Sequence, residues 1–285
     1  MARIYRPLVT LLMLLFAASA AHAAVDDEEY LARKGLSDRW QINFGYYLVD
    51  FDTNVRWDSE ELGKGTSIDL EDDLGLDDKR SDLRIDGFYR FGRKHRLNLG
   101  YLFLGRAATK VVLEEQIEFD GVIFDVGAAI ESDFDTQSLK VAYSYSFVNN
   151  GRVDFGISAG ISAFYFEAGI AGDGTIVIDG EPITGFVAAG EELIAPVPVG
   201  GIRFEYTIRP RLIFRTAAQY FAIELDSWEA DLYDWVASID YYPGKHIGFG
   251  VAYDFTGIRY VDKGSDRLRF DYDYSGLVLY LNLNY

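Results

Sequence analysis

The chain has 285 residues, and its 45 acidic residues outnumber its 27 basic ones, which gives a formal net charge of −18. This negative balance argues against nucleic acid as a partner, since phosphates would be repelled, and the absence of cysteine excludes a disulfide scaffold and thiolate chemistry. Aromatic residues make up 15% of the chain, which is too many for a disordered acidic protein.

The first residues have the pattern of a secretory signal peptide. Arg3 and Arg6 precede an apolar run over residues 8–20, and Ala21-His22-Ala23 supplies the small residues of a cleavage site. A transmembrane helix is the alternative, but it needs about 18 or more apolar residues. We therefore predict an exported protein with a cleaved signal peptide (1–23), a short N-terminal segment (24–38) and one all-β domain (39–285).

The rest of the chain alternates apolar with polar or small residues, with the period of two that is typical of β-strands with two different faces. In the last segment, for example, Leu277 and Leu279 share one face while Val278 and Tyr280 share the other. Ten such segments follow one another, over residues 39–51, 81–92, 95–107, 136–148, 151–167, 195–209, 211–225, 230–242, 246–257 and 268–285.

The connections between these segments alternate in length. Tight turns near 92–95, 149–152, 209–211 and 243–245 contain Gly, Asn or Pro, which suit the backbone angles of turns. The connections 52–80, 108–135 and 168–194 are long. Short turns at one end and long loops at the other predict an antiparallel up-and-down transmembrane β-barrel of about ten strands, with periplasmic turns and extracellular loops.

A soluble periplasmic β-sandwich is the alternative, since its strands also alternate, with the apolar face inward. Two features favour the membrane. The polar faces carry small residues such as Gly156 and Ser158, and the chain ends on Tyr285 with Leu281 and Leu283 at every second position before it. This ending resembles the C-terminal signal by which the barrel-assembly machinery recognises Gram-negative outer-membrane proteins, and we expect that machinery as a partner.

The stretch IDLEDDLGLDDKRSDLRIDGFYRFGRKHRLNLGYLFLGR, residues 68–106, is similar to a family of poorly characterised proteobacterial outer-membrane proteins. The resemblance implies a barrel in the outer membrane, surrounded by lipid and lipopolysaccharide. It supplies no catalytic residues.

The inward faces of the predicted barrel carry charges of both signs: Arg84, Asp86, Arg106, Lys140, Asp154, Arg203, Glu205, Arg215, Asp240 and Asp254. Either these charges pair across the lumen and fill it, or they form a ring that selects solutes in a narrow pore. About eight strands are just filled by side chains and about sixteen leave an open channel, so ten strands favour pairing. Residues 26–35 either form a short helix that plugs the periplasmic mouth or a disordered leader.

Six carboxylates are clustered in the first long loop: Asp69, Glu71, Asp72, Asp73, Asp77 and Asp78. Their spacing lacks the alternating ligands and the sixth-position Gly of an EF-hand. A looser Ca²⁺ or Mg²⁺ site that bridges to lipopolysaccharide phosphates is one hypothesis, and a solvated loop is the favoured one. Leu70, Leu74 and Leu76 between the acids predict that the segment packs locally.

Two other long loops each contain an Asp-Gly pair between β-rich runs, at 120–121 and 179–180, the pair preferred by tight hairpin turns. We predict that the flanking strands continue above the membrane as hairpins that pair or fold over the barrel mouth. Such loops often bind partners. If either hairpin inserts into the membrane, the barrel has twelve strands.

Catalysis is not expected. Barrel proteases, phospholipases and lipid A deacylases use a His near the extracellular rim as a general base. Beyond the signal peptide this chain has only His95 and His246, which fall at turns of the periplasmic end. We therefore expect a structural or surface-binding barrel without a cofactor, and the alternative is a narrow passive channel for small cationic solutes.

Overall fold

The computed structural model describes residues 38–58, 67–113, 117–119, 122–124, 126–178, 181–264 and 267–285. The predicted signal peptide lies outside these residues, as does the N-terminal segment apart from Asp38. Ten long strands make up most of the described chain: β1 (Trp40–Asp58), β3 (Lys79–Gly92), β4 (His95–Val112), β7 (Ala129–Asn149), β8 (Val153–Ile178), β9 (Glu181–Arg209), β10 (Leu212–Glu224), β11 (Trp228–Tyr241), β12 (Ile247–Asp262) and β13 (Arg267–Asn284). Among the described residues, no helix is long and apolar enough to cross a membrane.

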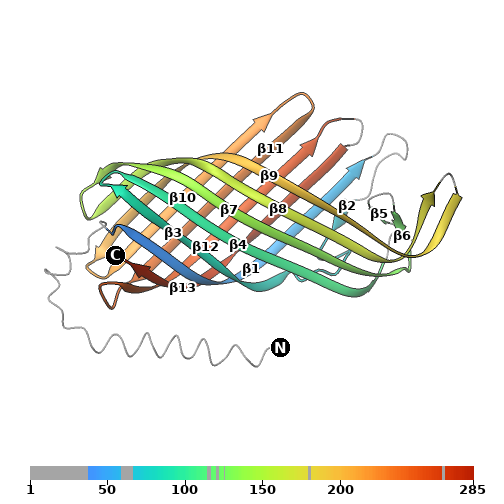
Figure 1. The fold of residues 1–285 in the computed structure, drawn as a ribbon, viewed down its shortest axis with the longest axis horizontal. Coiled ribbons are helices and arrows are strands. Elements are labelled where there is room, and N and C mark those ends of the chain that lie inside the picture. Colours follow the sequence, from blue (N-terminus) through green and yellow to red (C-terminus); the bar gives the residue numbers. More distant parts are fainter. Residues whose placement is uncertain are drawn as a thin grey trace.

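The ten long strands form one closed antiparallel barrel (Figure 1). Each pairs with the next along the chain, and β1 also pairs with β13, from Gln41 opposite Asn284 to Asp58 opposite Arg267. All ten predicted segments are strands of this barrel, which confirms the predicted fold class. The twelve-strand alternative is wrong, because β5 (Ile117–Phe119) and β6 (Val122–Phe124) pair with each other beside the ring, where β6 also pairs with β8.

The two ends of the barrel differ. The tight turns after β3, β7, β9 and β11 lie at the end that also holds the C-terminus, called here the turn end (Figure 1). At the opposite end, the loop end, β8 and β9 extend well beyond most other strands. The connection predicted over 168–194 is wrong in extent, since β8 and β9 stay paired from Val153 opposite Tyr206 to Ile178 opposite Glu181.

Both predicted hairpins exist above the barrel. The β5–β6 hairpin joins the extended β8–β9 hairpin, where Val122 lies opposite Ile176. The Asp-Gly pairs themselves lie outside the described residues. The prediction that these hairpins continue the strands and pair with each other is confirmed.

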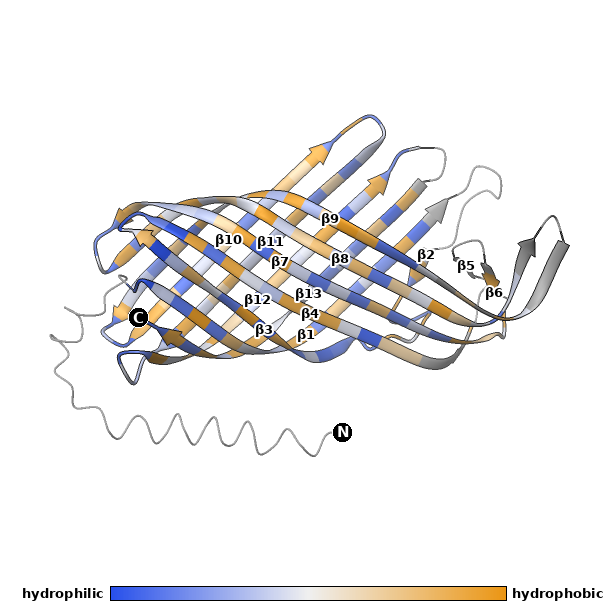
Figure 2. Ribbon diagram, viewed as in Figure 1, coloured by the Kyte–Doolittle hydropathy of each residue, from blue (hydrophilic) through white to orange (hydrophobic). Residues whose placement is uncertain are grey.

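Alternation along each strand separates an outer from an inner face, as the alternating colours of Figure 2 show. On β1 the side chains of Ile42 and Phe44 are 40% and 46% exposed, whereas Tyr47 between Tyr46 and Leu48 is fully buried. The close packing of strands at the seam requires a glycine at position 276, because a Cβ there would lie 1.9 Å from the Leu48 carbonyl oxygen. The apolar surface therefore faces outward and the polar and aromatic side chains fill the interior.

Candidate functional site

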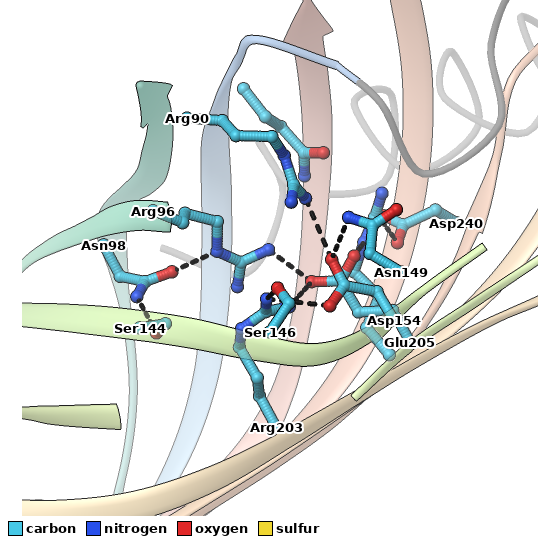
Figure 3. A network of polar contacts seen from close by, with 12 residues as sticks. Arg90, Arg96, Asn98, Ser144, Ser146, Asn149, Asp154, Arg203, Glu205 and Asp240 are labelled. Carbon is cyan, nitrogen blue, oxygen red and sulfur yellow. Dashed lines mark hydrogen bonds and ion pairs between the residues drawn. The ribbon is translucent and has the colours of Figure 1, made fainter. Parts of the chain in front are cut away.

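The interior near the turn end holds a network of buried charges, which we call the turn-end cluster (Figure 3). Asp154 on β8 lies at its centre and accepts hydrogen bonds from Arg90 at 3.1 Å and from Arg203 at 2.9 Å. Glu205, two residues after Arg203, pairs with Arg96 and with Arg203, and Arg215 reaches it at 3.6 Å. Arg215 also pairs with Asp240, whose carboxylate accepts a hydrogen bond from the Tyr280 hydroxyl at 2.6 Å.

A second group of charges, the middle cluster, lies halfway along the barrel. Arg84 on β3 pairs with Asp254 on β12 at 2.7 Å and with Asp86 at 3.1 Å. Lys140 on β7 pairs with Asp234 on β11, which also accepts a hydrogen bond from Thr256 at 2.8 Å. The Arg84–Asp254 and Lys140–Asp234 pairs each join strands that are not neighbours in the sheet, and so cross the lumen.

The two clusters are electrically balanced. Six basic and six acidic side chains take part: Arg84, Arg90, Arg96, Lys140, Arg203, Arg215, Asp86, Asp154, Glu205, Asp234, Asp240 and Asp254. Removing charges from water is costly unless each is paired and hydrogen-bonded. Each of these twelve groups has an oppositely charged partner within 4.0 Å.

Of the charges that the sequence analysis placed inside the barrel, all but Arg106 belong to these two clusters. Arg90, Arg96 and Asp234 were missed as site residues. The sequence contains a signal for two of them. Arg90 is an even number of residues from Arg84 and Asp86, and Asp234 is an even number of residues from Asp240, so each shares a strand face with predicted lumen charges.

A cavity of about 210 Å³ is lined by residues of both clusters, including Arg84, Asp86, Arg203 and Glu205. Uncharged polar side chains complete its wall, among them Gln41, Asn43, Asn98, Ser158 and Gln219. A water molecule needs roughly 10–15 Å³ measured in this way, so the cavity has room for several waters or one small polar solute.

Toward the loop end the interior becomes aromatic. The ring of Phe134 packs edge-on against Tyr272 with centroids 5.6 Å apart, and Phe166 contacts Phe270 at 5.4 Å. Together with Tyr274 and Phe164, these rings, all buried except the partly buried Phe270, form what we call the aromatic layer. The layer separates the charged clusters from the mouth of the barrel at the loop end.

The mouth beyond this layer is occupied by residues 67–78, which we call the acidic segment. Its short strand β2 (Ser67–Asp69) pairs with β1. Leu70, Leu74 and Leu76 are buried in the same core cluster as the aromatic layer, so the prediction of local packing is confirmed. These leucines are buried because packing in the apolar mouth of the barrel removes their side chains from water.

Glu71 anchors the acidic segment to the barrel wall. Its carboxylate pairs with Arg106 and accepts a hydrogen bond from the Thr53 backbone N–H at 2.9 Å. The Arg106 guanidinium also donates to the Thr53 hydroxyl at 2.9 Å and lies over the ring of Phe51, 4.3 Å from its centroid. Arg106, the one predicted lumen charge outside the two clusters, is thus paired with one of the six acidic-loop carboxylates.

Three other acids of this segment bond to groups close to them in the sequence. Asp69 accepts from the backbone N–H groups of Glu71 and Asp72, and Asp73 accepts from that of Asp69. Asp78 hydrogen-bonds to Lys79 at 3.1 Å, and this bond and the charge of Asp78 raise the pKa of Lys79. Asp72, Asp73, Asp77 and Asp78 are exposed. Within the described parts of the chain, no three His, Cys, Asp or Glu side chains converge as a metal site would require.

Both histidines beyond the signal peptide lie at the turn end. His95, the first residue of β4, is hydrogen-bonded to the Tyr143 hydroxyl at 2.6 Å. His246 contacts the Asn284 backbone oxygen at 3.0 Å and stacks on Tyr285. Neither is near the loop end, where an extracellular catalytic centre would lie.

The last residue closes the barrel seam. The Tyr285 carbonyl accepts hydrogen bonds from the N–H groups of Arg39 at 2.6 Å and Trp40 at 3.0 Å. The Tyr285 ring is exposed, and Leu281 and Leu283 of the predicted assembly signal lie on the same outer face of β13.

Neither a protein-family model nor a curated protein matches the sequence. Among solved structures, the outer membrane protease OmpT from Escherichia coli is similar with a TM-score of 0.52 and 12% identity, over 89% of this chain and 100% of that chain. OprG from Pseudomonas aeruginosa has a TM-score of 0.40 and 14% identity, over 87% and 96% of the two chains, and the Pseudomonas putida toluene transporter TodX has 0.34 and 10%, over 94% of each. At such identities the likeness concerns the fold alone. The chain therefore has the closed antiparallel barrel fold of Gram-negative outer-membrane proteins.

Proposed function

We propose that the protein is a non-catalytic outer-membrane barrel whose lumen is closed by its own side chains and whose loop end serves as a binding surface on the cell exterior. The observation that carries this proposal is the balance of the lumen charges, six basic and six acidic groups that pair with one another. A selective pore needs charges that are free to meet the solute. Here the charges are bonded across the lumen, and the acidic segment covers the mouth.

The outer-membrane location is supported by the fold and by the outer face of the barrel. Large apolar side chains such as Phe44, Leu83, Leu139 and Ile161 are exposed on the strands, as lipid contact requires. The exposed acids Asp72, Asp73 and Asp77 would lie at the level of lipopolysaccharide, where Ca²⁺ or Mg²⁺ can bridge carboxylates and phosphates.

The absence of catalysis is supported by the positions of His95 and His246 at the turn end. OmpT is named as a protease, but its likeness to this chain extends to the fold only.

A narrow passive channel for small cationic solutes is the second candidate. The cavity of about 210 Å³, which residues of both clusters line, favours it, because a polar cavity inside the lumen can hold a small solute during its passage. For solutes to pass, both the turn-end cluster and the aromatic layer would have to open.

Planar-bilayer recording of the refolded barrel separates the two candidates. A closed lumen gives no conductance steps, either in the wild type or in the exposed-loop variant Asp226→Asn. Steps in the wild type that change in size in Glu205→Gln would establish the channel instead.

The orientation is tested with single cysteines, since the chain has none of its own. Asp226→Cys, in the connection between β10 and β11, should react with a membrane-impermeant maleimide on intact cells. Gly244→Cys at the turn end, where an added Cβ meets no atom within 4 Å, should react only after the outer membrane is opened. The reverse pattern would contradict the proposed orientation.

A further inference from the structure

The part of β9 that extends beyond the barrel has a free edge. On one side, β9 pairs with β8 without a break from Glu181 to Tyr206. On the other side its pairing with β10 begins only at Gly200, opposite Tyr220. Within the described chain, no strand pairs with the outer edge of residues 181–199. This stretch therefore offers a row of backbone N–H and C=O groups for which the fold supplies no strand.

The direction of these groups follows from the register. Thr207 donates its backbone N–H to the Arg152 carbonyl, next to β8, and the pairing of β8 with β9 continues without a shift. Because successive residues of a strand point their N–H groups to opposite sides, the odd-numbered residues of β9 face β8 and the even-numbered ones face the free edge.

The prolines of β9 agree with this assignment. Pro182, Pro196 and Pro198 are all even-numbered. The backbone nitrogen of each therefore lies on the free-edge side, and its lack of a hydrogen removes no hydrogen bond from the pairing with β8. They stand at the two ends of the free stretch. Between them, residues 184–194 contain no proline and keep every edge donor.

The side chains around this edge are anionic and apolar. No Lys or Arg occurs between Arg152 and Arg203. Glu192 on β9 lies directly opposite Glu167 on β8, a like-charge pair that is unfavourable in a sheet. Phe186 and Ile194, on the same face of β9 as Glu192, are 72% and 70% exposed.

We propose that the free edge of β9, residues 184–194, binds an extended polypeptide segment with basic side chains, which adds to the sheet as a further strand. Backbone hydrogen bonds to the even-numbered residues would supply the part of the affinity that does not depend on the sequence of the bound segment. Lys or Arg side chains would relieve the repulsion between Glu167 and Glu192, and apolar side chains would cover Phe186 and Ile194. The proposal rests on the surface-binding role proposed above and names the chemistry of its partner.

Edge strands are often protected by charges and prolines, and that protection is the competing explanation. It accounts for Pro196 and Pro198 beside the barrel. It does not account for a stretch of eleven residues without proline that also exposes two large apolar side chains.

The test uses the full barrel in detergent micelles and a short synthetic peptide of alternating Lys and Val, with a peptide of alternating Glu and Val as its control. Binding is measured by fluorescence anisotropy at two salt concentrations. The Lys-Val peptide should bind, and more weakly in high salt because its charges are screened. The Glu-Val peptide should not bind.

Two variants assign the binding to the edge. Ala188→Pro removes an edge donor without touching the β8 ladder and should weaken binding about tenfold, through the lost hydrogen bond and the obstructing ring. Glu192→Gln should weaken it about two- to fivefold while the hairpin itself is not destabilised. Asp226→Asn, on another connection of the same end, should leave it unchanged. Circular dichroism confirms that each variant is folded.

Failure of the peptide to bind, equal binding of both peptides, or full binding by Ala188→Pro would overturn the proposal. Self-association of the wild type that Ala188→Pro abolishes would also overturn it, since the occupant would then be a second copy of the chain. These outcomes are independent of bilayer conductance, so a silent barrel that binds no peptide would refute this inference and leave the closed-lumen function in place.

Discussion

At the residue scale, the interior of the barrel depends on buried charges that have few alternatives to their present partners. Asp154 is fully buried and bonds to Arg90, Arg203 and the Asn149 amide. Replacing a balanced ion pair as a whole can be neutral, whereas removing one member leaves an uncompensated charge. The carboxylate of Asp154 is therefore expected to contribute strongly to the free energy of unfolding, although it lies near the turn end of the barrel.

We predict that Asp154→Asn destabilises the folded barrel by about 3–5 kcal/mol, because two guanidinium groups lose their shared counterion. The urea midpoint of refolded protein in detergent measures this change. Asp226→Asn, an exposed carboxylate in a connection, should shift the stability by no more than about 0.5 kcal/mol. Equal midpoints for the two variants would show that the turn-end cluster does not stabilise the barrel.

At the scale of elements, the acidic segment behaves as a lid that belongs to the core. Its leucines fill the mouth above the aromatic layer, and Glu71 is bonded to Arg106 on β4. The remaining acids point to solvent or cap nearby backbone N–H groups. Sequence motifs for metal binding do not describe such a segment, since its leucines pack in the barrel mouth while its acids bond to Arg106, cap backbone N–H groups or face solvent.

We predict that Leu74→Asp releases the acidic segment from the mouth. The substitution removes buried apolar contacts and places a carboxylate beside the aromatic layer, at a cost of about 3 kcal/mol or more. The undocked population should rise roughly a hundredfold, and proteinase K should then cut within residues 67–78. Asp77→Asn, on the exposed side, is the matched control. Unchanged protection in Leu74→Asp would mean that the segment does not depend on this packing.

The alternation of side chains predicted all ten barrel strands because it is a local property. The ends of the strands were not predictable in the same way. β8 and β9 continue through Gly169, Gly172 and Gly190, where small residues weaken the alternation, and their extent there depends on pairing between strands rather than on local sequence. The sequence also did not predict the partners of the lumen charges. The pairing of inward residues across the lumen depends on the stagger of the strands in the closed barrel, which is not a local property.

At the scale of the whole molecule, the barrel is held closed at the seam between β1 and β13. The seam runs along the full length of β1, and it ends in the hydrogen bonds between Tyr285 and Trp40. The terminal residue thus combines the predicted assembly signal with the last contacts of the ring.

Deletion of Tyr285 should lower the amount of folded barrel in the outer membrane severalfold. It removes the backbone hydrogen bonds to Arg39 and Trp40 and the aromatic end of the signal. The heat-sensitive gel mobility of membrane extracts measures the folded fraction. Tyr285→Phe keeps the backbone and the ring and should assemble normally. A deletion variant that assembles as well as the wild type would argue against this role of the last residue.

The ion pairs also bear on how a correct barrel is distinguished from an incorrect one during assembly. Alternation forbids a slip of one residue between strands, because it would turn the apolar face inward, but it tolerates a slip of two. A slip of two residues at the seam would displace Arg84 from Asp254 by about 7 Å, since these residues lie on strands that β1 and β13 separate. Such a barrel would still present an apolar outer face to the lipid, but it would bury unpaired charges. The ion pairs of the lumen therefore favour one register of barrel closure over registers shifted by two residues.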